Sequence, residues 1–375
     1  MRILKIILLL ILCINSFYCK KDIAQVSLFD ENNPMFVIGS DKENVDELGI
    51  YDVISLYYVD TKNNVYIGDI VETRIDKFSS DGNYLFSIGR KGQGPGEFEG
   101  IPAFAVNSEG FLYTTSIRKK FMIFGPKGVF LEEIDFPDEF EKDYKENIKI
   151  DYNDNIYVLF SSSQKGYRLV KFDKKMTNYS IIHTDDKRNR LDYTAASVLP
   201  LLIPDFNFDK ENNVYITDTV DYSIYVYSSN GELKRIFKKD FNRNKITEHD
   251  LIFNVGEKIV DLSFQANYIF KDLKGGNRFL PSVFGININN DKVLVWTSNQ
   301  DKDFKYIIDI YDLNFNYIGS GSYYNFLPRN MLTTMNNIFY VPNIAPDNLE
   351  IKEKIGRLSL FNIPYKLLAY EITMN

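Results

Sequence analysis

Cysteine, histidine and tryptophan are scarce in this chain of 375 residues, which holds two, two and one of them. Cys13 lies within an apolar stretch near the start, and Cys19 follows that stretch. So few thiols exclude a disulfide framework and a thiolate metal cluster from the mature chain. The two histidines, His183 and His249, argue against a metal site built from several imidazoles of one chain.

Basic residues are also fewer than acidic residues. Lysine and arginine number 44 against 51 aspartates and glutamates, a formal net charge of -7. Loss of residues 1–18 would remove Arg2 and Lys5 and bring the charge to -9. Binding to nucleic acid needs clustered basic residues that neutralise phosphates. We therefore expect no nucleic-acid partner.

A long apolar run is missing as well, because the apolar core of the first residues extends only from Ile6 to Ile14. A membrane-spanning helix needs about 20 apolar residues, whereas a basic start and a short apolar core are typical of an export signal. We interpret residues 1–18 as a signal peptide. Cys19 resembles the acylated cysteine of bacterial lipoproteins, although Tyr18 replaces the usual small residue. The resemblance implies an exported protein of the cell envelope that contacts the membrane only through its lipid; plain secretion is the alternative.

One short sequence pattern recurs along the rest of the chain. It consists of a turn rich in Asn, Asp or Gly, then a strand of alternating apolar residues, then a polar break. Three of the five intervals between its six copies are 45 or 46 residues, and the other two are longer. Such a period is typical of repeat architectures. The six copies have these first strand residues: Val65, Phe111, Ile156, Val214, Val293 and Ile338.

Each repeat contains about four short strands bounded by turn residues, and such a unit is typical of a propeller blade. In the first repeat the strands are expected at Ile54–Val59, Val65–Ile67, Arg74–Phe78 and Tyr84–Ile88. The sequence therefore predicts an all-β fold: a six-bladed β-propeller of four-stranded antiparallel blades over residues 46–375. A run of unrelated β-sandwiches is the alternative.

Two insertions interrupt the repeats, at about residues 183–205 and 243–282. The spacing of Val255, Ile259 and Leu262 in the second predicts a short helix between blades four and five. Residues 19–45 are interpreted as a lipid-anchored linker, and its stretch Val26–Ile38 is a candidate strand for closing the ring. The last segments of the chain, at 357–361 and 367–372, offer an alternative way to complete the sixth blade.

The segment from Ile88 to Phe98 is rich in glycine and resembles the repeat of NHL-type propellers. The order of the units is similar to that of six-bladed propeller lipoproteins of Bacteroidetes. The resemblance implies that Arg90, Lys91 and Gln93 lie near the mouth of the central channel and bind ligand. A phosphate-binding loop is excluded because proline follows the last candidate glycine where lysine is required. A purely structural turn between blades is the simpler interpretation of the segment.

No Gly-x-Ser-x-Gly motif supplies a nucleophile. Carboxylates recur at strand ends, at Asp60, Asp151, Asp209 and Asp218, and such oxygens are able to hold Ca²⁺; turns also favour Asp at these places. We expect a monomeric, non-enzymatic binding or scaffold module for a peptide, a glycan or an envelope protein. A cation-dependent hydrolase or lyase with its site in the central channel is the alternative, and a simple spacer ring is a third.

Overall fold

The computed structural model describes residues 34–38, 54–69, 72–100, 103–115, 120–162, 165–185, 203–218, 220–243, 252–255, 258–261, 282–301, 306–323, 333–335, 338–344 and 365–371. The predicted signal peptide and Cys19 lie outside these segments. Within them the chain forms strands and one short 3-10 helix, η2 at Asp138–Phe140. None of the described helical residues belongs to a helix long and apolar enough to cross a membrane.

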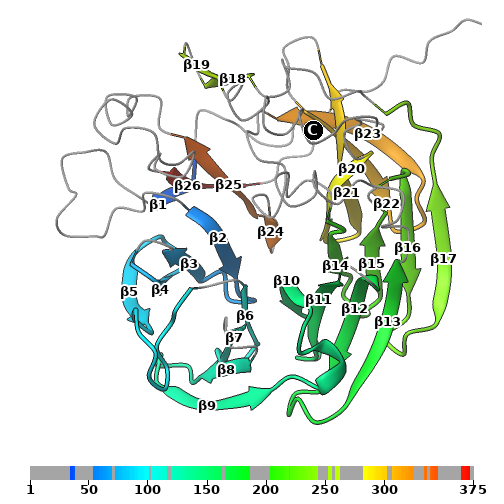
Figure 1. Ribbon diagram of the computed structural model, residues 1–375. Coiled ribbons are helices and arrows are strands. Elements are labelled where there is room, and N and C mark those ends of the chain that lie inside the picture. Colours follow the sequence, from blue (N-terminus) through cyan, green and yellow to red (C-terminus); the bar gives the residue numbers. More distant parts are fainter. Residues whose placement is uncertain are drawn as a thin grey trace, which may run out of the picture.

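The described strands form six four-stranded antiparallel sheets, which follow one another around a common centre (Figure 1). Blade 1 contains β2 (Ile54–Val59), β3 (Val65–Asp69), β4 (Arg74–Phe78) and β5 (Tyr84–Ile88). Blade 2 contains β6 (Phe104–Val106), β7 (Leu112–Thr115), β8 (Lys120–Phe124) and β9 (Phe130–Asp135). Blade 3 contains β10 (Tyr144–Ile150), β11 (Ile156–Ser162), β12 (Gly166–Phe172) and β13 (Tyr179–Asp185).

The remaining blades follow the same plan. Blade 4 contains β14 (Phe206–Phe208), β15 (Val214–Thr217), β16 (Ser223–Tyr227) and β17 (Leu233–Lys238). Blade 5 contains β20 (Val283–Asn289), β21 (Lys292–Gln300), β22 (Tyr306–Asp312) and β23 (Tyr317–Tyr323). Blade 6 contains β24 (Thr333–Met335), β25 (Ile338–Ile344), β26 (Tyr365–Glu371) and β1 (Phe36–Ile38). The predicted propeller of four-stranded antiparallel blades is confirmed.

Blade 6 joins the two ends of the chain. Strand β1 pairs antiparallel with β26, with Phe36 opposite Ala369 and Ile38 opposite Leu367. The last three residues of the candidate closing stretch Val26–Ile38 form this strand. Because β1 comes from the N-terminal part and the other three strands from the C-terminal part, this sheet closes the ring and removes an open end.

The innermost strands of neighbouring blades touch around the centre, as β2 does with β6, β6 with β10, β14 with β20 and β20 with β24. Apolar side chains fill the space between the adjacent sheets of blades 1–5. One cluster joins blades 1 and 2 through Ile75, Phe104 and Phe124, and another joins blades 4 and 5 through Ile224 and Val293. Several of the described aromatic rings also pack one blade on the next, as Phe121 does on Phe172 and Tyr157 on Phe208.

The second insertion differs from its prediction. Its described residues form a two-stranded antiparallel sheet, β18 (Ile252–Val255) with β19 (Lys258–Asp261), where the sequence predicted a short helix. A spacing of four between Val255 and Ile259 suits a helix, but half of the residues of each segment are β-branched and favour strands. In the first insertion, β13 continues to Asp185, so the strand extends into the predicted range 183–205.

Candidate functional site

The glycine-rich loop at residues 89–98 connects blade 1 to blade 2 and is held by its own backbone. The Phe98 N–H donates to the Arg90 carbonyl at 2.7 Å, and the Gly92 N–H donates to the Phe98 carbonyl at 3.0 Å. The Glu97 carboxylate accepts the Gly94 N–H at 2.8 Å and the Arg90 Nε–H at 2.8 Å. The Gly94 N–H and the Arg90 guanidinium lower the pKa of the Glu97 carboxyl. These bonds fix the loop in one shape.

Arg90, Lys91 and Gln93, which were predicted to bind ligand, are exposed on this loop. The Arg90 guanidinium forms an ion pair with the Glu97 carboxylate, although the Arg90 side chain is 81 % exposed. The loop also packs against blade 2, because Phe98 is fully buried beside Phe124 of β8. This geometry agrees with a structural connector between blades, and ligand binding by the three residues stays a prediction.

A second polar region lies where the innermost strand of a blade turns into the second strand. We call residues 60–64, 107–111, 151–155 and 209–213 the inner turns of blades 1–4. In each one, a side-chain oxygen of the first residue accepts the N–H of the fifth. These bonds are Asn64 to Asp60 at 2.9 Å, Phe111 to Asn107 at 2.8 Å, Asn155 to Asp151 at 2.8 Å and Asn213 to Asp209 at 2.8 Å.

The fourth residue of every inner turn has a positive φ: Asn63 at 62°, Gly110 at 91°, Asp154 at 62° and Asn212 at 61°. Glycine, asparagine and aspartate are the residues that adopt this left-handed conformation most readily. The local sequence therefore accounts for the turns as the repeat pattern predicted.

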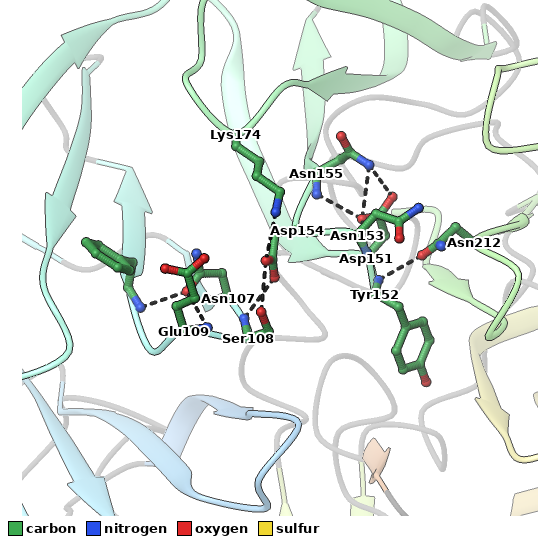
Figure 2. A network of polar contacts seen from close by, with 11 residues as sticks. Asn107, Ser108, Glu109, Asp151, Tyr152, Asn153, Asp154, Asn155, Lys174 and Asn212 are labelled. Atoms are coloured by element: carbon green, nitrogen blue, oxygen red, sulfur yellow. Dashed lines mark hydrogen bonds and ion pairs between the residues drawn. The ribbon is translucent and has the colours of Figure 1, made fainter.

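Two of these left-handed residues reach across to the preceding blade (Figure 2). Asp154 accepts the Ser108 N–H and the Ser108 hydroxyl, each at 2.8 Å, and the Lys174 ammonium at 3.1 Å. Asn212 accepts the Tyr152 N–H at 2.8 Å. The inner turns of blades 2, 3 and 4 are therefore joined side by side by their own side chains.

These hydrogen bonds favour the ionised form of the Asp154 carboxyl. Burial alone would raise the pKa of its carboxyl, but the hydrogen bonds from Ser108 and Lys174 outweigh it and lower the pKa. Nothing in the sequence singles out Asp154 as a bridge between blades. The local sequence shows only an Asp at the position where the turn needs a left-handed residue. Such an Asp would be equally expected in a turn that makes no bond to the neighbouring blade.

Next to the bonded groups, other side chains of the same turns are exposed. Tyr152 is 44 % exposed, and its ring points away from the hydrogen bonds in Figure 2. Partial desolvation of the phenol, whose turn lies against the neighbouring blades, and to a smaller extent the charge of Asp209 raise the pKa of Tyr152. The other exposed side chains of the joined turns are Ser108, Glu109, Asn153, Lys210 and Glu211.

The four carboxylates considered for calcium serve as acceptors for backbone N–H groups. Asp60, Asp151 and Asp209 belong to the inner turns described above, and Asp218 accepts the Val220 N–H at 2.7 Å. Across the segments that the structure describes, no group of three or more His, Cys, Asp or Glu side chains is placed to hold a metal ion. In this part of the chain the acids position the backbone.

A third polar group links the innermost strands of blades 3–5. Lys149 on β10 donates to Asp205 Oδ1 at 2.9 Å and to the Phe206 carbonyl at 2.6 Å. Asp205 Oδ2 accepts the Ile286 N–H of β20 at 3.1 Å. Asn207 on β14 donates to Asn287 Oδ1 at 3.1 Å. These polar bonds connect the innermost strands of blades 3, 4 and 5.

The repeated sheets, the shared closing blade and the joined turns define a β-propeller. Residues 43–274, which contain blades 1–4 and the β18–β19 hairpin, match the family DUF5128, described as a 6-bladed beta-propeller. The match covers more than half of the chain, so the protein belongs to this family. No curated protein matches the sequence significantly.

Solved structures resemble the chain in fold only. A crystal structure of a DUF4221 family member from Bacteroides vulgatus aligns with a TM-score of 0.57 at 9 % identity, covering 94 % of this chain and 99 % of that one. Regucalcin from Agrobacterium tumefaciens, a calcium-binding protein, aligns with a TM-score of 0.46 at 10 % identity, covering 94 % and 96 %. The resemblance to NHL-type propellers stays a prediction.

Proposed function

We propose that this propeller is an exported binding or scaffold module, held at a membrane by an acylated Cys19, and that it presents its surface to a peptide, a glycan or another envelope protein. The observation that carries the proposal is that two sets of side chains in the inner turns have different roles. Their acidic and amide side chains are engaged in fixing the backbone, whereas neighbouring side chains are exposed to solvent.

Such an arrangement suits binding because a surface fixed in advance loses little conformational freedom when a ligand arrives. The same argument applies to the loop at 89–98, whose backbone is closed by the Arg90–Phe98 and Gly92–Phe98 bonds. Its exposed residues Arg90, Lys91 and Gln93 are the second surface that we propose for ligand contact.

The binding function is tested by cross-linking the full-length, tagged protein in its own cells and purifying it from the envelope fraction. We expect a polypeptide or glycan that co-purifies with the protein and not with an unrelated tagged lipoprotein of the same envelope. Replacement of Arg90, Lys91 and Gln93 together by alanine then shows whether this loop contributes. Recovery of the same background material with both tagged proteins would contradict a binding role.

The anchor is tested separately by Cys19→Ala. An acyl chain contributes about 0.8 kcal/mol per buried CH₂ group to membrane binding, so its loss should move the protein from the membrane fraction to the soluble envelope fraction. Cys13→Ala, which leaves the predicted acylation site intact, is the control. Membrane retention of the Cys19 variant would show that the anchor is not a lipid on this residue.

A further inference from the structure

The six exposed side chains of the joined inner turns form a surface with a distinct composition. We call this set the inner-turn surface: Ser108, Glu109, Tyr152, Asn153, Lys210 and Glu211. We propose that it binds a neutral carbohydrate chain, with the ring of Tyr152 stacked on a sugar. The inference rests on the proposed binding function and names the ligand class of that function.

The backbone beneath Tyr152 is fixed on both sides. Its N–H donates to Asn212 of blade 4, and the turn it belongs to continues into Asp154, which accepts two hydrogen bonds from Ser108 of blade 2. Asp151 accepts the N–H groups of Asn153 and Asn155 within the same turn. The tyrosine therefore projects from a turn that is held by three blades (Figure 2).

The chemistry of the surface favours a sugar over a protein partner. Protein interfaces bury a core of several apolar and aromatic residues, and among the six side chains here only Tyr152 is a large apolar group. A pyranose ring offers one face of C–H groups, which suits a single aromatic ring, and hydroxyls around its edge. Hydroxyl, carboxylate, amide and ammonium groups such as those of Ser108, Glu109, Asn153 and Lys210 exchange hydrogen bonds with such hydroxyls.

The charges of the surface favour a neutral chain. Glu109 and Glu211 carry negative charge, and Lys210 stands beside Glu211 with a positive one. Lys174, at the edge of the turns, is paired with Asp154. Because both signs are interspersed, the surface has no one-signed patch that would select a strongly charged ligand.

The chain supplies a matched control for Tyr152. Tyr144 begins β10 and Tyr152 follows its end, so the two tyrosines lie at opposite ends of one innermost strand. Tyr144 is 73 % exposed, more than Tyr152 at 44 %. Exposure alone would make Tyr144 the better ligand contact, whereas the fixed turn singles out Tyr152.

The test uses the full-length protein in detergent and soluble hexasaccharides of glucose, xylose, mannose and N-acetylglucosamine, with binding measured by calorimetry. We expect at least one to bind, Tyr152→Ala to weaken it about tenfold, as loss of an aromatic contact of this size does, and Tyr152→Phe to keep it within about twofold. Asn212→Gly, which keeps the left-handed backbone at this position and removes the acceptor of the Tyr152 N–H, should weaken binding by freeing the turn. Tyr144→Ala should leave binding unchanged. Thermal unfolding of each variant checks that the fold is intact.

Absence of binding to every hexasaccharide, or equal binding by the wild type and Tyr152→Ala, would overturn the inference. The proposed binding function would still stand after either result if cross-linking in the cell recovers a polypeptide partner. Loss of binding in Tyr144→Ala instead of Tyr152→Ala would place the sugar at the other end of β10 and would likewise overturn the assignment to the inner-turn surface.

Discussion

Asp205 and Lys149 form an ion pair between the innermost strands of neighbouring blades, with 2.9 Å between Asp205 Oδ1 and Lys149 Nζ. The other carboxylate oxygen accepts the Ile286 N–H at 3.1 Å. One side chain of blade 4 therefore bonds to blade 3 and to blade 5. Each blade buries its faces against its neighbours, so groups that cross blade boundaries contribute directly to the closed ring.

Asp205→Asn is predicted to lower the free energy of unfolding by about 2 kcal/mol, because a partly buried ammonium loses its charged partner and an amide cannot serve both former donors equally well. Urea unfolding followed by circular dichroism measures the change. In a double-mutant cycle with Lys149→Met, the second substitution should cost less once Asp205 is replaced. Strictly additive costs would show that the pair contributes no coupling.

The strands were predictable because their signals are local. The expected ranges Ile54–Val59, Arg74–Phe78 and Tyr84–Ile88 coincide with β2, β4 and β5. Alternating apolar residues and turn formers fix a hairpin without reference to distant chain. The six repeats then lead to the propeller, since a four-stranded sheet of this period needs neighbours to cover it.

The bonds between blades were not predictable in this way. Ser108 and Asp154 are 46 residues apart in sequence, and Lys149 and Asp205 are 56 apart. An Asp in a turn is already explained by the turn, so nothing in the sequence shows that its oxygens also reach the neighbouring blade. The predicted ligand residues Arg90, Lys91 and Gln93 came from a family resemblance alone.

The glycine-rich loop offers a sharp test of its packing. Gly89 has a φ of +68°, and a Cβ added there would lie 2.1 Å from the Phe98 ring. Gly89→Ala should therefore lower the free energy of unfolding by about 3 kcal/mol, through backbone strain and overpacking. At Gly94 an added Cβ meets only the end of the Glu97 side chain, at 3.1 Å. Gly94→Ala is the control and should cost less than half as much in thermal unfolding.

Ring closure depends on β1, which the chain places as the outermost strand of blade 6. Ile38 is 2 % exposed and Val37 is 41 % exposed, although they are neighbours on one strand. Ile38→Ala should lower the free energy of unfolding by about 3 kcal/mol, because it removes buried methyl groups. Val37→Ala should cost about 0.5 kcal/mol as a surface substitution. Equal effects of the two in chemical denaturation would show that β1 is not packed on the ring.

The carboxyl of Asp154 makes the joined turns sensitive to acid. Its pKa is lowered in the folded chain by Ser108 and Lys174 despite burial, so its ionised form favours the fold. This stabilisation is complete above the ordinary aspartate pKa, near 4, and is lost as the pH falls through the lower folded value. Asp154→Asn keeps one acceptor for the Ser108 N–H but removes the charge. The variant should be less stable than the wild type at pH 7, and the gap should narrow at pH 3.

Asn212→Gly is the matched control for this pH dependence, because it removes the bond to the Tyr152 N–H without removing a titratable group, and glycine tolerates the positive φ of this position. Its cost should stay the same from pH 7 to pH 3, whereas that of Asp154→Asn should shrink. Urea midpoints of the three proteins at pH 7, 5 and 3 give the comparison. A gap for Asp154→Asn that does not change with pH would mean that the charge of Asp154 contributes nothing to the joined turns.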